Sequence, residues 1–293
     1  MRTRIRRVNP VQLTALIRAA ATDVLTGHGV DTATLRTIDW TAPIARPKDP
    51  ARGEYATSVA LRAGSALDLP ARALAADLAA ALSGRDEIAS AEVAGAGFVN
   101  LRLAAAARGE LIGEVLAAGD GYGRPDRHVV HHVVDDDAYE TLAERVGPDV
   151  ARYALLRSTR PEPGVLARRV EENPAFLVRF AHARMCALAR WARELGVTGG
   201  EEYGLLTGPA ETALIGTLGE FEAVARCEPD RVTRYLERLA VAVGEFERTC
   251  PVLPMGDAPA TERHRARLAL AKAARQVLRN GLDLLGVDAP ERM

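Results

Sequence analysis

Apolar residues in the second half of the chain recur at the three- and four-residue spacing that is typical of α-helices. Patterns of this kind predict long helices over 138–158, 172–195, 208–226, 229–249 and 261–285. Strand patterns nearly vanish beyond residue 138, so this half predicts an all-α bundle. A proline-rich stretch, CPVLPMGDAPA, separates the last two predicted helices and is expected to form a loop.

The first half of the chain alternates between helical and strand-like patterns. Helices are predicted over 10–26, 55–67, 70–83 and 104–118. Two short strands are predicted on either side of the Gly95/Gly97 turn, within IASAEVAGAGFVNLRL. We expect a further strand and then a loop in TLRTIDWTAPIARPKDPARGEY, where prolines interrupt any longer pattern.

This order of elements predicts a small α+β domain followed by a helical domain. We place the α+β domain at 1–122, a linker at 123–140 and the helical domain at 141–293. HVVHHVVDDD, within the linker, has the pattern of a short strand that enters an acidic turn. The fold class expected for the whole chain is therefore α+β and then all-α.

The segment NPAFLVRFAHARMCALARW, residues 173–191, combines two kinds of surface on one predicted helix. One side carries Leu177, Phe180, Leu188 and Trp191 with Arg184 in their midst, and a second side carries Arg179, His182, Arg190 and Arg193. Two interpretations are open from the pattern alone. Either Phe180 is a core residue and Arg184 pairs with a buried carboxylate, or both lie at a surface that stacks on RNA bases.

The formal net charge of −1 hides an uneven distribution of charge. Arginines concentrate in 149–193 and 262–279, whereas acidic residues dominate 120–144 and 194–223. Such separation predicts a local positive surface on a nearly neutral protein. The three cysteines are far apart and form no C-x-x-C pair, which is typical of a reducing cytoplasm. We expect a cytoplasmic protein with no membrane partner, because no apolar run approaches the length of a membrane span.

Motifs for phosphate binding and nucleophilic catalysis are missing from the sequence. It contains no G-x-x-x-x-G-K-[ST] and no G-x-S-x-G, and its glycine clusters are typical of turns. His128, His131, His132 and Asp135 to Asp137 have metal-binding side chains, but adjacent histidines on a strand point to opposite sides. We therefore favour a surface turn there, and we expect no metal, no cofactor and no catalytic residues.

Five segments in the first half of the chain resemble the N-terminal tRNA-binding domain of arginyl-tRNA synthetases. They are NPVQLTALIRAA, PKDPARGEYATSVALR, LPARALAADLAAAL, IASAEVAGAGFVNLRL and LIGEVLAAGDGYGR. VGPDVARYALLRS resembles the D-A-L-R motif of the family's anticodon-binding domain, with Val150 and Ala151 in place of Ala-Leu. ENPAFLVRFAHARMC, CPVL and QVLRNGLDLLGVDAPERM are similar to later parts of that domain. The resemblance covers nearly the whole chain. It implies a helical domain of the class I synthetase anticodon-binding type.

The catalytic domain that the family carries between these two parts has no counterpart in the sequence. Neither an H-x-G-H signature nor a K-M-S-K-type loop occurs. We therefore expect a non-catalytic protein that binds tRNA or a tRNA-like RNA, and we expect no DNA partner. Three alternatives stay open: a regulatory module that binds a protein partner, an accessory subunit of an arginine–tRNA ligase, and a new active site near the linker histidines.

The resemblance also implies candidate RNA-binding residues. It places Phe180, Arg184 and Met293 near the anticodon loop, and Phe98 and Asn100 near the elbow of the tRNA. The family's tyrosines are replaced here: Tyr-Tyr before Gln-Tyr becomes Phe176-Leu177 before Arg179-Phe180, and Phe-Tyr before CPVL becomes Phe246-Glu247. The full candidate set is Phe98, Asn100, Arg157, Phe176, Arg179, Phe180, His182, Arg184, Arg190, Arg193, Phe246, Arg275, Arg279 and Met293. The arginines other than Arg184 are expected to contact the RNA backbone.

Overall fold

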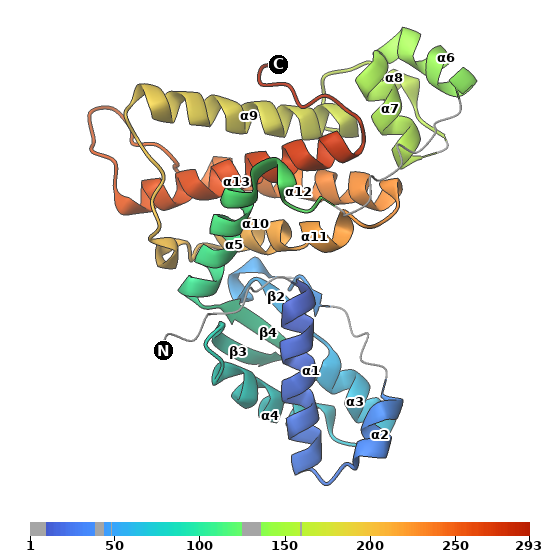
Figure 1. Cartoon of the computed structure of the whole chain (residues 1–293), viewed down its shortest axis with the longest axis vertical. Helices are drawn as coiled ribbons and strands as arrows, with labels where there is room; N and C mark the ends of the chain where they lie inside the picture. Colours follow the sequence, from blue (N-terminus) through green and yellow to red (C-terminus); the bar gives the residue numbers. More distant parts are fainter. Residues whose placement is uncertain (1–9, 39–43, 48, 125–135, 159) are drawn as a thin grey trace. The chain divides into compact units, whose positions relative to one another are not determined.

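A computed structural model describes residues 10–38, 44–47, 49–124, 136–158 and 160–293 of the chain (Figure 1). These residues form two units. The first combines the chain up to Leu111 with Thr207–Gly219, and the second combines Ile112–Leu206 with Glu220–Met293. The expected fold class, a small α+β region and then a helical domain, is confirmed. The linker histidines His128, His131 and His132 lie outside the described residues.

The first unit contains a four-stranded antiparallel sheet with the strand order β1-β2-β4-β3. Its elements in chain order are α1 (Pro10–Gly27), α2 (Thr32–Thr37), β1 (Ile44–Ala45), η1 (Pro50–Arg52), β2 (Tyr55–Thr57), α3 (Val59–Leu67), α4 (Ala71–Ser83), β3 (Ile88–Ala94), β4 (Phe98–Leu103), the start of α5 (Ala105–Ala118) and α10 (Pro209–Gly219). The predicted β3–β4 hairpin is confirmed, and Val93 pairs with Val99 across it.

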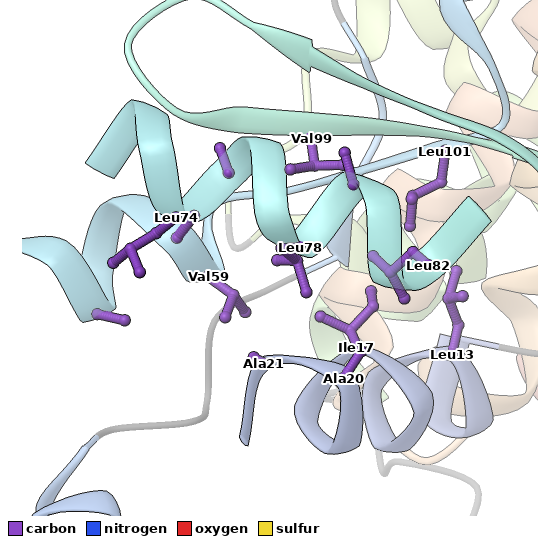
Figure 2. Packing of buried hydrophobic residues seen from close by; sticks show 14 of the residues in the cluster. Leu13, Ile17, Ala20, Ala21, Val59, Leu74, Leu78, Leu82, Val99 and Leu101 are labelled. Carbon is purple, nitrogen blue, oxygen red and sulfur yellow. The ribbon is translucent and has the colours of Figure 1, made fainter. Parts of the chain in front are cut away.

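The core of this unit lies around α4, which is placed between the sheet and α1 (Figure 2). Leu78 and Leu82 of α4 are buried together with Ile17 of α1 and with Val99 and Leu101 of β4. The helical spacing of the α4 leucines and the alternation along β4 bring these apolar groups to one place. Truncating such a leucine to alanine costs roughly 2–5 kcal/mol in a packed core.

Two local predictions in the first half are wrong. Residues 32–37 form a helix and not a strand, because the carboxylate of Asp31 accepts hydrogen bonds from the backbone N–H groups of Ala33 and Thr34 and caps it. The helix expected from residue 55 begins only at Val59. Tyr55 instead lies on a strand, where it pairs with Leu101 and buries its ring.

Helix α10 belongs to the first unit although it is distant from it in sequence. Arg46 donates a hydrogen bond to the carbonyl of Ala213 over 2.6 Å, and the hydroxyl of Tyr55 donates to the carbonyl of Gly216 over 3.2 Å. A Cβ at Gly216 would lie 1.9 Å from the Arg46 guanidinium, and one at Gly219 would lie 2.2 Å from the Tyr55 oxygen. The two glycines therefore allow these side chains to reach the α10 backbone.

The second unit is built from helices, and three long ones pack against one another: α9, α12 and α13. Its elements are the end of α5, η2 (Gly119–Gly121), α6 (Asp136–Val146), α7 (Pro148–Arg157), α8 (Pro163–Leu166), α9 (Pro174–Glu194), η3 (Tyr203–Leu205), α11 (Phe221–Val224), α12 (Pro229–Thr249) and α13 (Glu262–Leu284). Close packing of α12 on α13 requires Gly281, since a Cβ there would lie 2.5 Å from a methyl group of Leu236.

Three of the predicted long helices are confirmed and two are divided. The helices expected at 172–195, 229–249 and 261–285 appear as α9, α12 and α13. The expected helix 138–158 is broken at Gly147, which has a φ of +88° and precedes Pro148. The expected helix 208–226 becomes α10 and the short α11. None of the helices in the described ranges is both long and apolar enough to cross a membrane.

Candidate RNA-binding surface

Asn173 fixes the point at which α9 begins. Its side-chain oxygen accepts hydrogen bonds from the backbone N–H groups of Ala175 and Phe176, at 3.1 and 3.2 Å. Its amide group donates to the carbonyls of Leu166 and Arg168. Asn173 is buried, so the cap both starts the helix and joins it to the turn after α8. The side chains along α9 are therefore presented from a firmly held first turn.

One side of α9 presents aromatic rings and the Arg184 guanidinium. The rings of Phe176 and Phe180 are stacked with their centroids 5.3 Å apart, and Phe180 is 40% exposed. Arg184 follows one turn later and donates from Nε to both carboxylate oxygens of Glu247 on α12, at 3.0 and 3.2 Å. This pairing raises the pKa of the Arg184 guanidinium above its usual value. Arg184 remains 43% exposed at its side chain.

Neither interpretation of this side of α9 accounts for all of its contacts. Arg184 does pair with a carboxylate, as the core interpretation requires. Phe180, however, is not a core residue, and Trp191 on the same side is also exposed. Among the remaining members of the apolar stripe Leu188 is buried and Leu177 is half-buried. The apolar stripe therefore has a packed part, at Leu188, and an exposed part, at Phe180 and Trp191. Only the exposed part offers aromatic rings for stacking.

The second side of α9 holds the last residues of the chain. Arg179 donates from Nη2 to Asp149 over 2.9 Å and from Nε to the carbonyl of Asp288 over 3.1 Å. The Nδ1–H of His182 donates to the carbonyl of Pro290 over 2.9 Å. Arg190 donates to the carbonyl of Glu291 over 3.0 Å. The basic stripe seen in the sequence is therefore in large part a binding site for the chain's own residues 288–291, which we call the tail.

Burial lowers the pKa of His182 below its usual value, and the nearby positive charges of Arg275 and Arg279 act in the same direction. Its hydrogen bond to the tail and the carboxylate of Glu291 oppose this shift. The imidazole is accordingly held neutral at neutral pH, with its Nδ1 proton directed at the tail.

A cleft of about 420 Å³, the tail cleft, lies beside these contacts. Its titratable lining residues are His182, Cys186, Arg275, Arg279, Asp283, Asp288 and Glu291. Basic and acidic groups are thus mixed in the tail cleft. Arg279 also lies 3.6 Å from a carboxylate oxygen of Asp120.

A second cleft of about 450 Å³, the helix cleft, lies between the end of α9 and the middle of α13. It shares Arg275 with the tail cleft, and its other charged lining residues are Arg193 and Lys272. Lys272 was not a candidate from the sequence, although it lies within the basic segment 262–279. A helical projection of that segment would have placed it one turn before Arg275.

The other candidates differ widely in their access to solvent. Arg157 forms a two-pronged ion pair with Glu237, with distances of 2.6 and 3.2 Å. Phe246, on α12, is 0% exposed and packs in the core, so its ring cannot contact RNA in this conformation. Asn100 is likewise buried, in β4, whereas Phe98 at the start of that strand is exposed. Met293 is exposed as well.

Each half of the chain matches the model of a known protein family. Residues 12–103 match the family model described as "Arginyl tRNA synthetase N terminal domain", and residues 178–293 match the model described as "DALR anticodon binding domain". The chain therefore carries the N-terminal domain and the DALR anticodon-binding domain of the arginyl-tRNA synthetase family.

Relatives found by sequence and by structure carry the same family name. An arginine–tRNA ligase from Clavibacter sepedonicus is 45% identical over 165 residues, which cover 53% of this chain and 30% of that protein. The arginyl-tRNA synthetase structure from Thermus thermophilus matches at 24% identity with a TM-score of 0.41, and the match covers 63% of this chain and 32% of that one. The chain thus spans about a third of the length of each of these two proteins.

Proposed function

We propose that this protein binds tRNA, or an RNA that is folded like tRNA, without aminoacylating it. The observation that carries the proposal is the exposed ring of Phe180, which stacks on the half-buried Phe176 and lies one turn before Arg184 on α9. Phe180 and Arg184 fall within the match to the DALR anticodon-binding domain. Aromatic and guanidinium planes bind splayed bases of single-stranded RNA loops by stacking. Phe98 on the first unit and Met293 near the end of the chain are further exposed candidates.

The non-catalytic part of the proposal is supported by the sequence between the two family matches. Residues 104–177 contain neither an H-x-G-H signature nor a lysine. Transfer of an amino acid to tRNA through an adenylate requires groups that stabilise the charge on the ATP phosphates. In the parts of this segment that the structure describes, 104–124, 136–158 and 160–177, helices α5 to α8 occur without a strand that would hold a nucleotide at the edge of a sheet.

A titration with tRNA tests the binding proposal. We expect the purified chain to bind tRNA more tightly than a DNA duplex of similar length. Phe180→Ala should weaken tRNA binding by about five- to a hundredfold, the usual effect of losing one stacked base. Leu195→Ala is the control, because Leu195 is an exposed apolar residue at the C-terminal end of the same helix and is not part of the stack. Equal effects of the two substitutions, or equal affinity for DNA, would contradict the proposal.

An aminoacylation assay tests the catalytic alternatives. The chain, incubated with ATP, arginine and tRNA, should form no arginyl-tRNA, and formation of the product would overturn the non-catalytic assignment. The same assay with an active arginyl-tRNA synthetase tests for an accessory subunit, which would raise the rate of that enzyme. A chain that neither binds RNA nor changes this rate would leave the protein-binding alternative.

A further inference from the structure

The helix cleft contains three positive charges that no carboxylate among the described residues pairs with. Arg193 belongs to the last turn of α9, whereas Lys272 and Arg275 lie three residues apart on α13. None of the three forms an ion pair with any residue that the structure describes. Three cations around one hollow repel one another, and an anion placed between them removes that repulsion.

The lining of the helix cleft also offers neutral hydrogen-bonding groups. The hydroxyl of Thr198 accepts a hydrogen bond from Arg265 over 3.3 Å, which leaves its own proton for a ligand. Arg265 is partly offset by Glu262, 3.4 Å away. Gly196 ends α9 with a φ of +66°, and this left-handed turn carries the chain on to Val197 and Thr198 at the cleft.

The tail cleft lacks this excess of positive charge. Asp283, Asp288 and Glu291 line it together with Arg275, Arg279 and His182, whose imidazole is held neutral. An approaching anion therefore meets carboxylates in the tail cleft and only cations in the helix cleft. The two clefts share Arg275, so the difference arises from their other residues.

We infer that the helix cleft binds a phosphate group of the RNA backbone through Arg193, Lys272 and Arg275. This inference rests on the proposed RNA-binding function. The ligand chemistry is a phosphate with at least one negative charge, which arginine and lysine bind by charge-assisted hydrogen bonds. The cleft positions the RNA on the domain and carries no base recognition of its own.

The test compares the salt dependence of tRNA binding in two triple variants. The cleft variant is Arg193→Gln, Lys272→Gln and Arg275→Gln. The control variant is Arg169→Gln, Arg231→Gln and Arg263→Gln, which removes three exposed arginines that line neither cleft. Each lost phosphate contact should reduce the slope of log K against log salt by about 0.7–0.9. We expect a smaller slope and weaker binding for the cleft variant, and the parental slope for the control.

The outcomes separate this inference from the proposed function. If the parental chain binds tRNA and both triple variants keep its slope, the cleft assignment is wrong and RNA binding stands. If the parental chain binds no tRNA, the proposed function fails and the inference fails with it. The double variant Arg193→Gln and Lys272→Gln covers the case in which loss of Arg275, which contacts Cys186, prevents folding.

A second titration distinguishes RNA phosphate from a free phosphate compound. Inorganic pyrophosphate is added to the parental chain and to the cleft variant, and heat of binding is measured. Saturable pyrophosphate binding that only the parental chain shows, combined with unchanged tRNA binding in the cleft variant, would overturn the RNA assignment. Pyrophosphate that competes with tRNA for the parental chain supports it.

Discussion

The tail cleft and the helix cleft share Arg275 but differ in what their positive charges contact. Beside the tail cleft, Arg179, His182 and Arg190 all donate hydrogen bonds to the tail, and carboxylates line the cleft itself. At the helix cleft, Arg193 and Lys272 make no ion pair with a described residue. A continuous basic stripe in a sequence is therefore not one binding site. Part of it stabilises the fold, and the remainder is available to a ligand.

Arginines at the two ends of this stripe should differ most in their effect on stability. Arg179→Ala removes the partner of the half-buried Asp149 and a contact to the tail, so we expect a loss of about 1–3 kcal/mol in the free energy of unfolding. Arg193→Ala, on the exposed end of the same helix, should change it by less than about 0.5 kcal/mol. Urea unfolding measures both, and equal losses would refute the distinction between the clefts.

The tail contact of His182 should make stability depend on pH. The folded state lowers the pKa of His182, so the unfolded chain takes up a proton more readily as the pH falls. The neutral imidazole of His182 contributes its full share of the free energy of unfolding above its pKa in the unfolded chain, about 6.5. This share is lost as the pH falls from that value toward the lower pKa of His182 in the folded chain. We expect the free energy of unfolding to decrease in this window, as followed by urea unfolding at several pH values.

The variant His182→Gln isolates this effect, because its amide can still donate to the tail carbonyl but does not titrate. His264, whose pKa burial also lowers, is retained in both chains and contributes equally. The parental chain should therefore lose more stability on acidification than the variant. The same pH dependence in both chains would assign the effect to other groups.

A substitution in the helix cleft and one at a tail contact should differ in their effect on the salt dependence of tRNA binding. Lys272→Gln removes a charge from the helix cleft, and the salt slope of tRNA binding should fall by about 0.7–0.9. Arg190→Gln removes a guanidinium that donates to the carbonyl of Glu291, and we expect it to leave the slope unchanged. Filter binding at several salt concentrations gives both slopes. A larger change for Arg190→Gln would mean that RNA phosphate contacts the tail side of α9 and not the helix cleft.

The smallest effect is expected at the pair between Arg184 and Glu247, because Arg184 belongs to the proposed RNA surface and also pairs with a residue of α12. Glu247→Gln removes a negative charge beside the proposed RNA surface and weakens the hold on Arg184. Because exposed pairs contribute about 0–1 kcal/mol, tRNA affinity should rise by no more than about fivefold. A direct tRNA titration measures this, and a decrease in affinity would mean that RNA recognition requires the intact pair.

Local patterns in the sequence were sufficient to predict the helices and strands that are long and regular. The leucine spacing of α4 and the alternation of β3 and β4 predicted these elements, and the cap of α9 is visible as Asn173 before Pro174. The strand at Tyr55 was missed because it is formed by pairing with Leu101 of β4, which is remote in the sequence. No local periodicity reports a contact of that kind.

The candidate site was predictable to a similar degree. The pattern along α9 separated its aromatic side from its basic side, and its helical spacing placed Phe180 and Arg184 one turn apart. The pattern could not show that the tail engages Arg179 and Arg190, because the partner atoms are backbone carbonyls that every residue possesses. It likewise could not separate Phe246, which packs in the core, from the exposed Phe180.

The membership of α10 in the first unit has a consequence for how the chain folds during synthesis. The ribosome completes the sheet and its covering helices well before it reaches Pro209–Gly219. Until then Arg46 and Tyr55 cannot form their hydrogen bonds to the carbonyls of Ala213 and Gly216. The first unit is therefore incomplete until a segment about a hundred residues further along the chain has been synthesised. Closing such a distant contact is slow compared with forming a hairpin, so the last folding step of the first unit coincides with synthesis of the second.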